Sequence, residues 1–239
     1  MKVLSIGNSF SQDAHRYIHS IAKHEGVDIQ TLNLHIGGCS LETHYKHITE
    51  DNTIYEKEIN GQPTGGLISI KDALLSDDWD YITLQQVSSL SFDYSSYNPY
   101  LKELFNYVKK YRPNAKILLH QTWAYEDGSD LLFNTAHYDT AEEMYSAARK
   151  AYYKCLEDLP FDGIIPSGDA MIESVRLGIG KIHRDTFHAS FGAGRYMIGL
   201  VWYKYLTNND ITNNTFADLD EPISDEHRKI VITAANKAL

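Results

Sequence analysis

The sequence predicts an α/β fold in which a mostly parallel sheet of five strands is covered by helices on both faces. Three observations lead to this prediction. Five short strand-like segments alternate along the chain with segments that have apolar residues at helical spacing. Four of the predicted strands are followed directly by polar clusters, as strands are at the binding edge of a parallel sheet. The length of 239 residues suits one such domain, so residues 1–239 are expected to fold as a single unit.

The first part of the chain contains two strands and two helices of this pattern. The apolar run at residues 3–6 predicts a fully buried strand, and apolar residues at helical spacing over 14–22 predict the helix after it. Residues 28–36 alternate apolar with polar side chains, which predicts a second strand near an edge of the sheet. Ser40 is then expected to cap a short helix over residues 43–48.

Residues 52–70 interrupt the alternation and are predicted to form an inserted hairpin. The segments IYEKEI and LISI are strand-like, and the pairs Asn60-Gly61 and Gly65-Gly66 between them are turn formers. We expect this hairpin to lie against the same edge as the glycine turns that follow the first two strands.

The rest of the chain returns to the alternation of strands and helices. The predicted elements are a helix at 70–75, a strand at 80–84, a helix at 99–111, a strand at 115–119, a helix at 138–159, a strand at 163–166, and helices at 167–177, at 193–206 and from 224 to the C-terminus. Two segments are irregular, a tyrosine-rich loop at 92–100 and a polar stretch at 181–190.

Composition and charge exclude several classes of function. The formal net charge of −10, with no basic cluster to offset it, argues against a nucleic-acid partner and is compatible with neutral substrates such as sugars or esters. No apolar run approaches the roughly 18 residues of a membrane span, so no membrane partner is expected. Two cysteines cannot form a disulfide framework. The sequence does not predict the oligomeric state.

The first residues of the chain bear on where in the cell the protein is expected. The first strand begins directly after Met1, which leaves no room for a secretory signal, so the default expectation is a cytoplasmic protein. A secreted or periplasmic protein whose signal had been removed would have the same sequence.

Polar clusters follow four of the predicted strands. They are residues 7–11, 37–40, 85–89 and 120–125. In an open parallel sheet the carboxyl ends of the strands converge at one edge, where ligands bind. The sequence therefore predicts a binding site at this edge, without yet indicating its chemistry.

A serine, an aspartate and a histidine offer the chemistry of nucleophilic catalysis. A serine nucleophile needs a base for its proton, and the base needs a partner that fixes its tautomer. Ser9 follows the first strand, and Asp185 with His188 could supply both other groups from one turn late in the chain. Taken alone, Ser9 is typical of a helix cap and the pair is typical of a surface contact. Their joint presence in the order Ser, Asp, His favours a catalytic triad.

Acyl transfer also needs hydrogen-bond donors for the oxyanion. The backbone N–H of Ser9, at a helix start, is one candidate, and Gly38 is a second because a glycine turn lets the backbone approach a substrate. A side-chain amide from Gln86 or Gln85, at the end of the third strand, is a candidate for the third donor.

These motifs resemble the SGNH hydrolases, also called GDSL-type esterases and lipases, and in particular a bacterial branch that opens with a GNSF-type motif. The resemblance spans nearly the whole chain and is carried by three segments: IGNSFS at the first strand end, GGCS at the second, and DTFHAS followed by GAGRYMIG. It implies a three-layer α/β/α sandwich with a five-stranded parallel sheet. It also implies that Ser9 is the nucleophile, that Gly38 is an oxyanion donor, and that Asp185 and His188 complete the triad.

The sequence departs from the family in two places. The first block reads GNSF rather than GDSL, which changes the neighbour of the nucleophile but not the nucleophile. The third block of the family reads GxND, whose Asn donates to the oxyanion, whereas this strand ends in LQQVSS. Gln86 is the expected replacement for that Asn, with Gln85 and Ser88 as alternatives.

No metal or cofactor is expected. The pairs His44 with His47 and His183 with His188 are accidental in a chain of 11 histidines, because no carboxylate cluster completes a ligand set. Cys39 is expected to be a small buried residue, since no histidine stands at a recognisable spacing from it. A nucleotide or flavin binder is disfavoured because the chain lacks GxGxxG and Walker patterns.

The function expected from these features is that of a serine esterase that removes a short acyl group, such as acetyl, from a carbohydrate or related ester. Gln121 and Trp123 follow the fourth strand and are expected to bind substrate at the rim of the site. Abundant tyrosines would suit sugar surfaces, or simply partly exposed packing. The alternative function is a carbohydrate-binding protein that kept this fold without catalysis.

Overall fold

The computed structural model describes all 239 residues and contains one mixed sheet in the order β4-β3-β2-β1-β5-β6-β7. Its five parallel strands are β1 (Lys2–Ile6), β2 (Gln30–His35), β5 (Tyr81–Leu84), β6 (Lys116–His120) and β7 (Gly163–Ile165). The inserted hairpin, β3 (Tyr55–Ile59) and β4 (Gln62–Ile68), pairs antiparallel to β2 and extends the sheet at that edge. The predicted fold class is therefore confirmed, but the sheet has seven strands instead of five.

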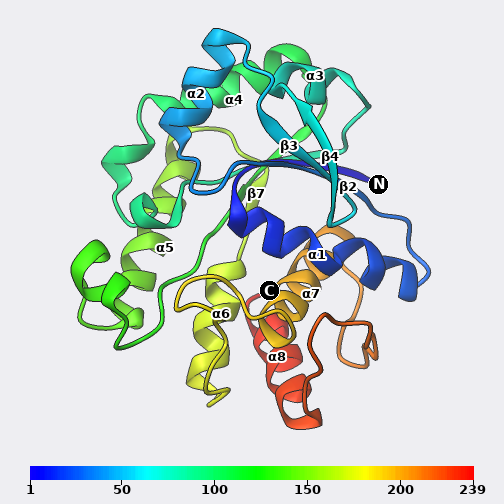
Figure 1. Cartoon of the computed structure of the whole chain (residues 1–239), viewed down its shortest axis with the longest axis vertical. Helices are drawn as coiled ribbons and strands as arrows, with labels where there is room; N and C mark the ends of the chain where they lie inside the picture. The colour runs from blue at the N-terminus through cyan, green and yellow to red at the C-terminus, as the bar shows by residue number, and fades with distance from the viewer.

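Helices cover both faces of the sheet and form the two outer layers (Figure 1). The helices are α1 (Ser9–His24), α2 (Leu41–Glu50), α3 (Ile70–Leu75), α4 (Tyr100–Tyr111), α5 (Ala141–Asp158), α6 (Ser167–Arg176), α7 (Ala193–Thr207) and α8 (Asp225–Lys237). One apolar core lies between the sheet and α1, α6, α7 and α8, and a second lies between the sheet and α2, α3, α4 and α5. This is the three-layer sandwich expected from the resemblance. No helix of the structure combines the length and apolar character needed to cross a membrane.

The tertiary packing explains the unusual apolar character of α7. Twelve of its fifteen residues are buried, because α1, α6 and α8 all pack against it. A helix enclosed in this way has no solvent face that requires polar residues. The predicted helix at 193–206 is therefore confirmed, and it packs against all three other helices of its layer.

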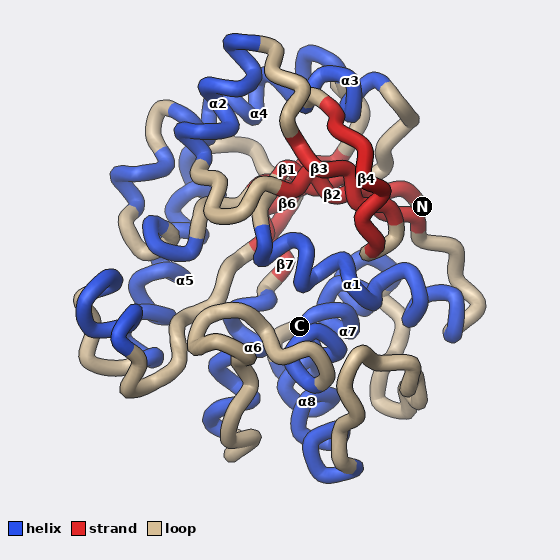
Figure 2. The backbone as a smooth tube through the Cα atoms, in the orientation of Figure 1, coloured by secondary structure: helices blue, strands red, loops and turns tan.

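Several details differ from the predicted elements. The segment at 138–159 becomes helical only at Ala141, where Thr140 caps α5, and a single π-helical turn, Leu131–Ala136, precedes it. The tyrosine-rich loop contains a short 3₁₀ turn at Tyr94–Tyr97. Figure 2 shows the strands in the interior, the helices in the layers around them and loops on several sides of the molecule.

Candidate active site

Ser9 lies at the first position of α1, directly after the tight turn that follows β1. Asn8 caps this helix, and its Oδ1 accepts the backbone N–H of Phe10 at 3.0 Å. The turn requires glycine at position 7, because a Cβ there would lie 2.3 Å from Oγ of Ser11. Since Asn8 supplies the cap, the hydroxyl of Ser9 is not needed for that role. The N–H of Ser9 belongs to the first turn, whose N–H groups have no acceptor within the helix.

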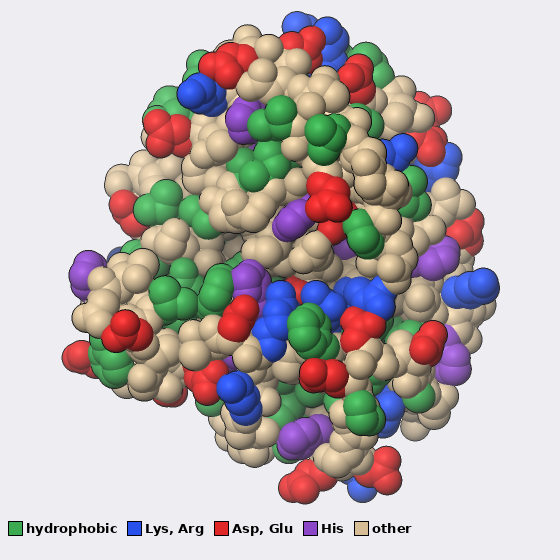
Figure 3. Space-filling view, in the orientation of Figure 1, with side chains coloured by type: hydrophobic (Ala, Val, Ile, Leu, Met, Phe, Trp, Pro, Cys, Tyr) green, Lys and Arg blue, Asp and Glu red, His purple; other side chains and the backbone are tan.

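Asp185 and His188 reach Ser9 from the loop before α7, in a continuous chain of hydrogen bonds. Oγ of Ser9 lies 2.8 Å from Nε2 of His188, and Nδ1 of His188 lies 2.7 Å from Oδ2 of Asp185. Oδ1 of the same carboxylate accepts the backbone N–H of His188 at 2.8 Å. The structure thus brings together the three side chains that the sequence singled out. Figure 1 shows the start of α1 beside this loop, and Figure 3 shows that the same face of the molecule is hollowed near its centre.

The surroundings of Asp185 favour its charged form. Burial by itself raises the pKa of this carboxyl, but the hydrogen bonds from the ring and the backbone of His188, with the charge of Arg184, outweigh it. The pKa therefore lies below its usual value of 3.8. A carboxylate in this position can orient the imidazole and stabilise the imidazolium that forms when a serine proton is transferred.

Aromatic packing fixes the loop that carries Asp185 and His188. Nε1 of Trp123 donates to the carbonyl of Phe187 at 2.7 Å, and the ring of Trp123 stacks on Phe10 with centroids 4.2 Å apart. The ring of Phe187 lies 3.8 Å from the imidazole of His188. The loop is therefore anchored to the first turn of α1, on the same element that carries Ser9.

A buried carboxylate on α1 supplies a second anchor. Asp13 is fully buried, and its oxygens lie 2.8 Å from Nη1 of Arg184 and 2.8 Å from Nε of Arg195. Asp13 also accepts the backbone N–H of Ala189 at 3.0 Å. Arg184 and Ala189 stand on either side of the segment 185–188, so Asp13 holds both ends of that segment against the helix that begins with Ser9.

The same network extends to Asp220, which makes the protein sensitive to acid. Hydrogen bonding to the Arg16 guanidinium lowers the pKa of Asp220 to about 2, and Arg195 contributes its charge. A carboxyl whose pKa is depressed on folding stabilises the native state above its unfolded pKa, and this stability disappears as the pH falls through the folded value. We therefore expect urea unfolding to show a loss of stability between about pH 4 and about pH 2. In Asp220→Asn this part of the loss should be missing, and an equal acid response in both proteins would contradict it.

Asn8 also joins the turn of Ser9 to the turn that contains Gly38. Its Nδ2 donates to the carbonyl of Cys39 at 3.0 Å, and its Oδ1 accepts Nε2 of Gln85 at 2.7 Å. Asn8, Cys39 and Gln85 are all nearly fully buried. An aspartate at position 8 would cap the helix equally well but could not donate to Cys39.

This difference yields a prediction for Asn8→Asp. The substitution keeps the helix cap and leaves the buried carbonyl of Cys39 without a donor, so the free energy of unfolding should fall by about 1–3 kcal/mol. Urea unfolding measures the change, and Asn213→Asp, at an exposed position, is the matched control. An unchanged stability in Asn8→Asp would show that the link to Cys39 contributes nothing.

Behind Asn8, a chain of buried side chains has one consistent set of proton positions. Because the amide of Gln85 donates to Asn8, its Oε1 must accept from Nδ1 of His120, at 2.7 Å. Nε2 of His120 then accepts from Oγ of Ser167 at 3.1 Å. Burial lowers the pKa of His120 to about 3, which keeps this imidazole neutral. His120 is therefore linked to the turn before Ser9 through Gln85 and Asn8, whereas His188 is the histidine that is hydrogen-bonded to Ser9 itself.

Gly38 keeps a free donor at this edge of the sheet. It lies in an exposed turn with a φ of +66°, a conformation that favours glycine, and its N–H has no hydrogen-bond partner. Cys39 follows Gly38 in the chain, and the hydrogen bond from Asn8 to its carbonyl holds this turn beside the start of α1. This arrangement is compatible with the oxyanion role expected for Gly38.

The glutamine expected as the third oxyanion donor is committed elsewhere. Nε2 of Gln86 donates to the carbonyl and to Oγ of Ser96, at 3.0 and 3.1 Å, while its Oε1 accepts the backbone N–H of Leu41. Its two amide protons are thereby used, so the prediction for Gln86 is wrong in this structure. The alternative, Gln85, directs its amide to Asn8, and the hydroxyl of Ser88 pairs with that of Tyr125 at 3.1 Å.

Gln121 and Trp123 do not lie on the rim of the site. Gln121 is fully buried and forms two hydrogen bonds with Asp169, one from its Nε2 at 2.7 Å and one to its Oε1 at 3.0 Å. Trp123 is 1% exposed and anchors the loop of His188. The expectation that these two side chains lie on the rim of the site is therefore wrong. The whole segment 120–125 is buried, so a position after β6 does not bring these side chains to the surface.

Sequence reasoning missed the supporting residues and one polar cluster. Asp13 falls one turn after Ser9, which is a local signal, but its arginine partners lie more than 170 residues away. Among the other histidines, Nδ1 of His44 lies 2.8 Å from the hydroxyl of Tyr55, and Nε2 of His183 lies 3.1 Å from the carbonyl oxygen of Ala124. Sequence reasoning also did not single out His35, Glu56 and Glu58, whose side chains converge beside α1.

Comparison with other proteins places this geometry in a family. Residues 2–238 match the family described as Domain of unknown function (DUF4886). A crystal structure of a DUF4886 family protein from Bacteroides uniformis is 35% identical, with a TM-score of 0.93 over 100% of this chain and 94% of that chain. Among the curated proteins, none matches this chain.

More distant solved structures share the architecture. A candidate SGNH hydrolase from Slackia heliotrinireducens has a TM-score of 0.59 at 18% identity, over 86% of this chain and 98% of that one. An acetylxylan esterase from Geobacillus stearothermophilus has a TM-score of 0.55 at 14% identity, over 86% and 94% of the two chains. The predicted resemblance to SGNH hydrolases is thus confirmed at the level of the fold. The chain belongs to the DUF4886 family, and its own architecture is that of the SGNH hydrolases.

Proposed function

We propose that the protein is a serine hydrolase of carboxylic esters, with Ser9 as nucleophile, His188 as base and then acid, and Asp185 as the group that orients the imidazole. The observation that carries the proposal is the unbroken chain from Oγ of Ser9 to Nε2 of His188, at 2.8 Å, and from Nδ1 of His188 to Asp185, at 2.7 Å. The first distance lies within the range that proton transfer from Ser9 to His188 requires, and the second is a hydrogen bond that can orient the imidazole.

The reaction follows from this geometry. Oγ of Ser9 attacks the ester carbonyl while its proton passes to Nε2 of His188, and the tetrahedral intermediate then collapses as the imidazolium protonates the departing alcohol. Water, deprotonated by His188, hydrolyses the acyl-serine and restores the free hydroxyl. Because Gln86 is committed to Ser96, the proposed oxyanion hole consists of the backbone N–H groups of Ser9 and Gly38.

For the substrate we propose a short acyl group, acetyl in the first instance, on a carbohydrate or related neutral alcohol. The net charge of −10 disfavours anionic esters. One protein of similar fold is an acetylxylan esterase, which makes acetylated xylo-oligosaccharides the first substrates to try.

A second candidate function is carbohydrate binding without turnover. It is favoured by one observation, namely that the amides of Gln85 and Gln86, the expected replacements for the family Asn, donate to Asn8 and to Ser96. An oxyanion hole with two backbone donors instead of three would lose about 2.7–4 kcal/mol of transition-state stabilisation, if the missing donor counts as much as in other hydrolases.

A side-by-side assay separates the two functions. Wild-type protein is incubated with acetylated xylo-oligosaccharides and with p-nitrophenyl esters of increasing acyl length, and with a fluorophosphonate probe for a reactive serine. We expect release of acetate, a rate that falls with acyl length, and labelling at Ser9. Ser20→Ala, on the same helix, should behave as the wild type. Glycan binding without turnover or labelling would favour the second function and contradict the first.

A further inference from the structure

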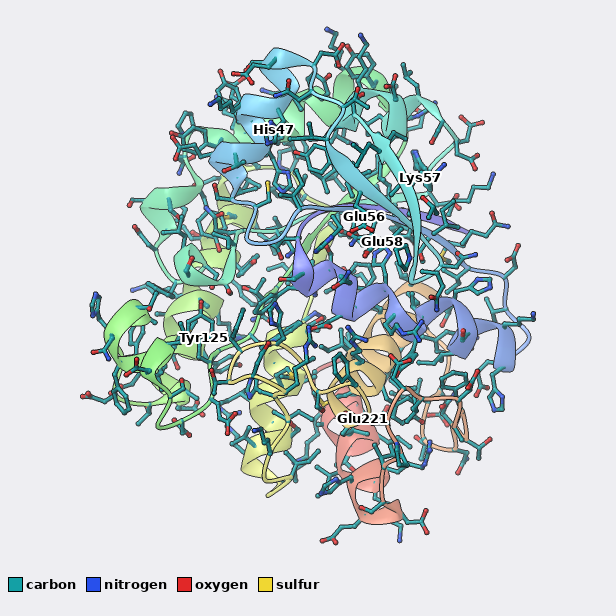
Figure 4. All side chains as sticks on the ribbon, in the orientation of Figure 1. His47, Glu56, Lys57, Glu58, Tyr125 and Glu221 are labelled. Atoms are coloured by element: carbon teal, nitrogen blue, oxygen red, sulfur yellow. The ribbon has the colours of Figure 1, made fainter.

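The inserted hairpin brings two carboxylates beside an imidazole of β2. In the antiparallel register His35 faces Glu56 and Asn33 faces Glu58, so all four side chains share one face of the β2–β3 ribbon. Nδ1 of His35 lies 3.3 Å from Oε2 of Glu56, and one donor atom from each of His35, Glu56 and Glu58 lies within 4.8 Å of the others. Figure 4 shows Glu56 and Glu58 together above the first turns of α1.

The charge of this cluster is not balanced by the protein. Glu58 is 2% exposed, and its hydrogen-bond partners are the neutral amides of Gln12 and Asn33, the latter at 2.7 Å. No lysine or arginine forms an ion pair with Glu56 or Glu58. A buried carboxylate costs several kcal/mol unless a cation or metal compensates it. Glu58 therefore meets two conditions of a metal ligand, since amides orient it and its charge is left for another group to neutralise.

We propose that His35, Glu56 and Glu58 bind a divalent transition-metal cation, with Zn²⁺ as the reference ion. One imidazole nitrogen and two carboxylate oxygens suit zinc, which bonds such ligands at about 2.0–2.2 Å. Tetrahedral ligands at that radius stand about 3.4 Å apart, so the 3.3 Å between His35 and Glu56 already fits and Glu58 has only a short distance to close. The histidine selects zinc over calcium and magnesium, which prefer oxygen ligands alone.

The site is open on one side and is linked to the helix that begins with Ser9. The side chain of Glu56 is 42% exposed and that of His35 is 20% exposed, which admits the ion and leaves room for water as a fourth ligand. Gln12, which holds Glu58, stands one turn after Ser9, and His35 precedes Gly38 by three residues. A bound cation would join the hairpin to β2 and, through the contact of Glu58 with Gln12, to α1. The metal site does not depend on the proposed hydrolase activity.

Zinc binding to the full-length chain tests the proposal directly. Protein freed of metal with a chelator is titrated calorimetrically with ZnCl₂, and the metal content after dialysis is measured by mass spectrometry. We expect one zinc per chain, a higher melting temperature with zinc, and no comparable effect of CaCl₂ or MgCl₂. Glu58→Gln and His35→Asn should each weaken binding by roughly tenfold or more, because each removes one of three ligands.

Matched variants distinguish zinc binding at this cluster from binding elsewhere on the surface and from the effects of misfolding. Glu157→Gln, an exposed glutamate on α5, should bind zinc as the wild type does. Glu56→Gln removes the most exposed ligand and is expected to fold even if Glu58→Gln does not, so its binding remains measurable. Absence of stoichiometric zinc in the wild type, or equal affinity in Glu56→Gln and Glu157→Gln, would overturn the proposal.

Discussion

Ser9→Ala is expected to reduce hydrolysis of p-nitrophenyl acetate by at least about 10³-fold while leaving the fold intact. The loss is large because the substitution removes the atom that attacks the ester, and His188 at 2.8 Å then has no hydroxyl to deprotonate. Stability should change by no more than about 0.5 kcal/mol, since Asn8 rather than Ser9 caps the helix. Initial rates and urea unfolding of the same preparation measure the two effects separately.

Ser20→Ala is the control for this experiment, because it makes the same chemical change on the same helix away from the site. It should retain the rate and the fluorophosphonate labelling of the wild type. Hydrolysis that persists at the wild-type rate in Ser9→Ala would contradict the role of Ser9 as nucleophile, whatever the result of zinc binding to the β2–β3 ribbon.

Asp13→Asn is expected to have the largest effect on stability of any single substitution considered for this protein. The carboxylate is fully buried between Arg184 and Arg195, so its removal leaves two guanidinium groups facing a neutral amide. Breaking one partner of a buried ion pair costs about 3–5 kcal/mol, which thermal and urea unfolding can measure. Because Asp13 also holds Ala189, the segment 185–188 should shift as well.

The kinetic effect of Asp13→Asn distinguishes positioning from general destabilisation. At a temperature where circular dichroism shows the variant to be folded, kcat should fall by about 10²-fold, as expected for a base displaced by about 1 Å, while KM changes little. Asp28→Asn, an exposed aspartate, should leave both quantities unchanged. A variant that melts early yet turns over substrate at the wild-type rate while folded would limit Asp13 to a structural role.

Most of the fold was predictable because patterns over a few neighbouring residues identify its helices and strands. The run at residues 3–6 and the helical spacing after it identify β1 and α1, and the same alternation identifies β5, β6 and β7. The hairpin at 52–70 was also predictable from its turn formers. That it extends the sheet to seven strands was not, because the pairing of β2 with β3 depends on backbone groups that no local pattern identifies.

The residues of the candidate site were likewise predictable only in part. Ser9, Asp185 and His188 stand out as residue types in a recognisable order, and the structure joins them within 2.8 Å. The role of Gln86 could not be predicted from its residue type, because an amide N–H donates equally well to an oxyanion or to a carbonyl. In the structure its amide donates to the carbonyl and the hydroxyl of Ser96. Trp123 was misjudged for a related reason, since a position after a strand does not say whether the chain turns outward or inward.

The sequence by itself determined the alternation of strands and helices, the sharp turn before Ser9, and the set of side chains able to carry acyl transfer. These properties follow from spacing and residue chemistry over a few positions. Only the tertiary structure decided the partners of Asp13, the commitment of Gln86, and the meeting of His35 with Glu56 and Glu58. Such contacts join segments that are distant along the chain, and the packing of the whole molecule, rather than local preference, selects which polar groups become neighbours.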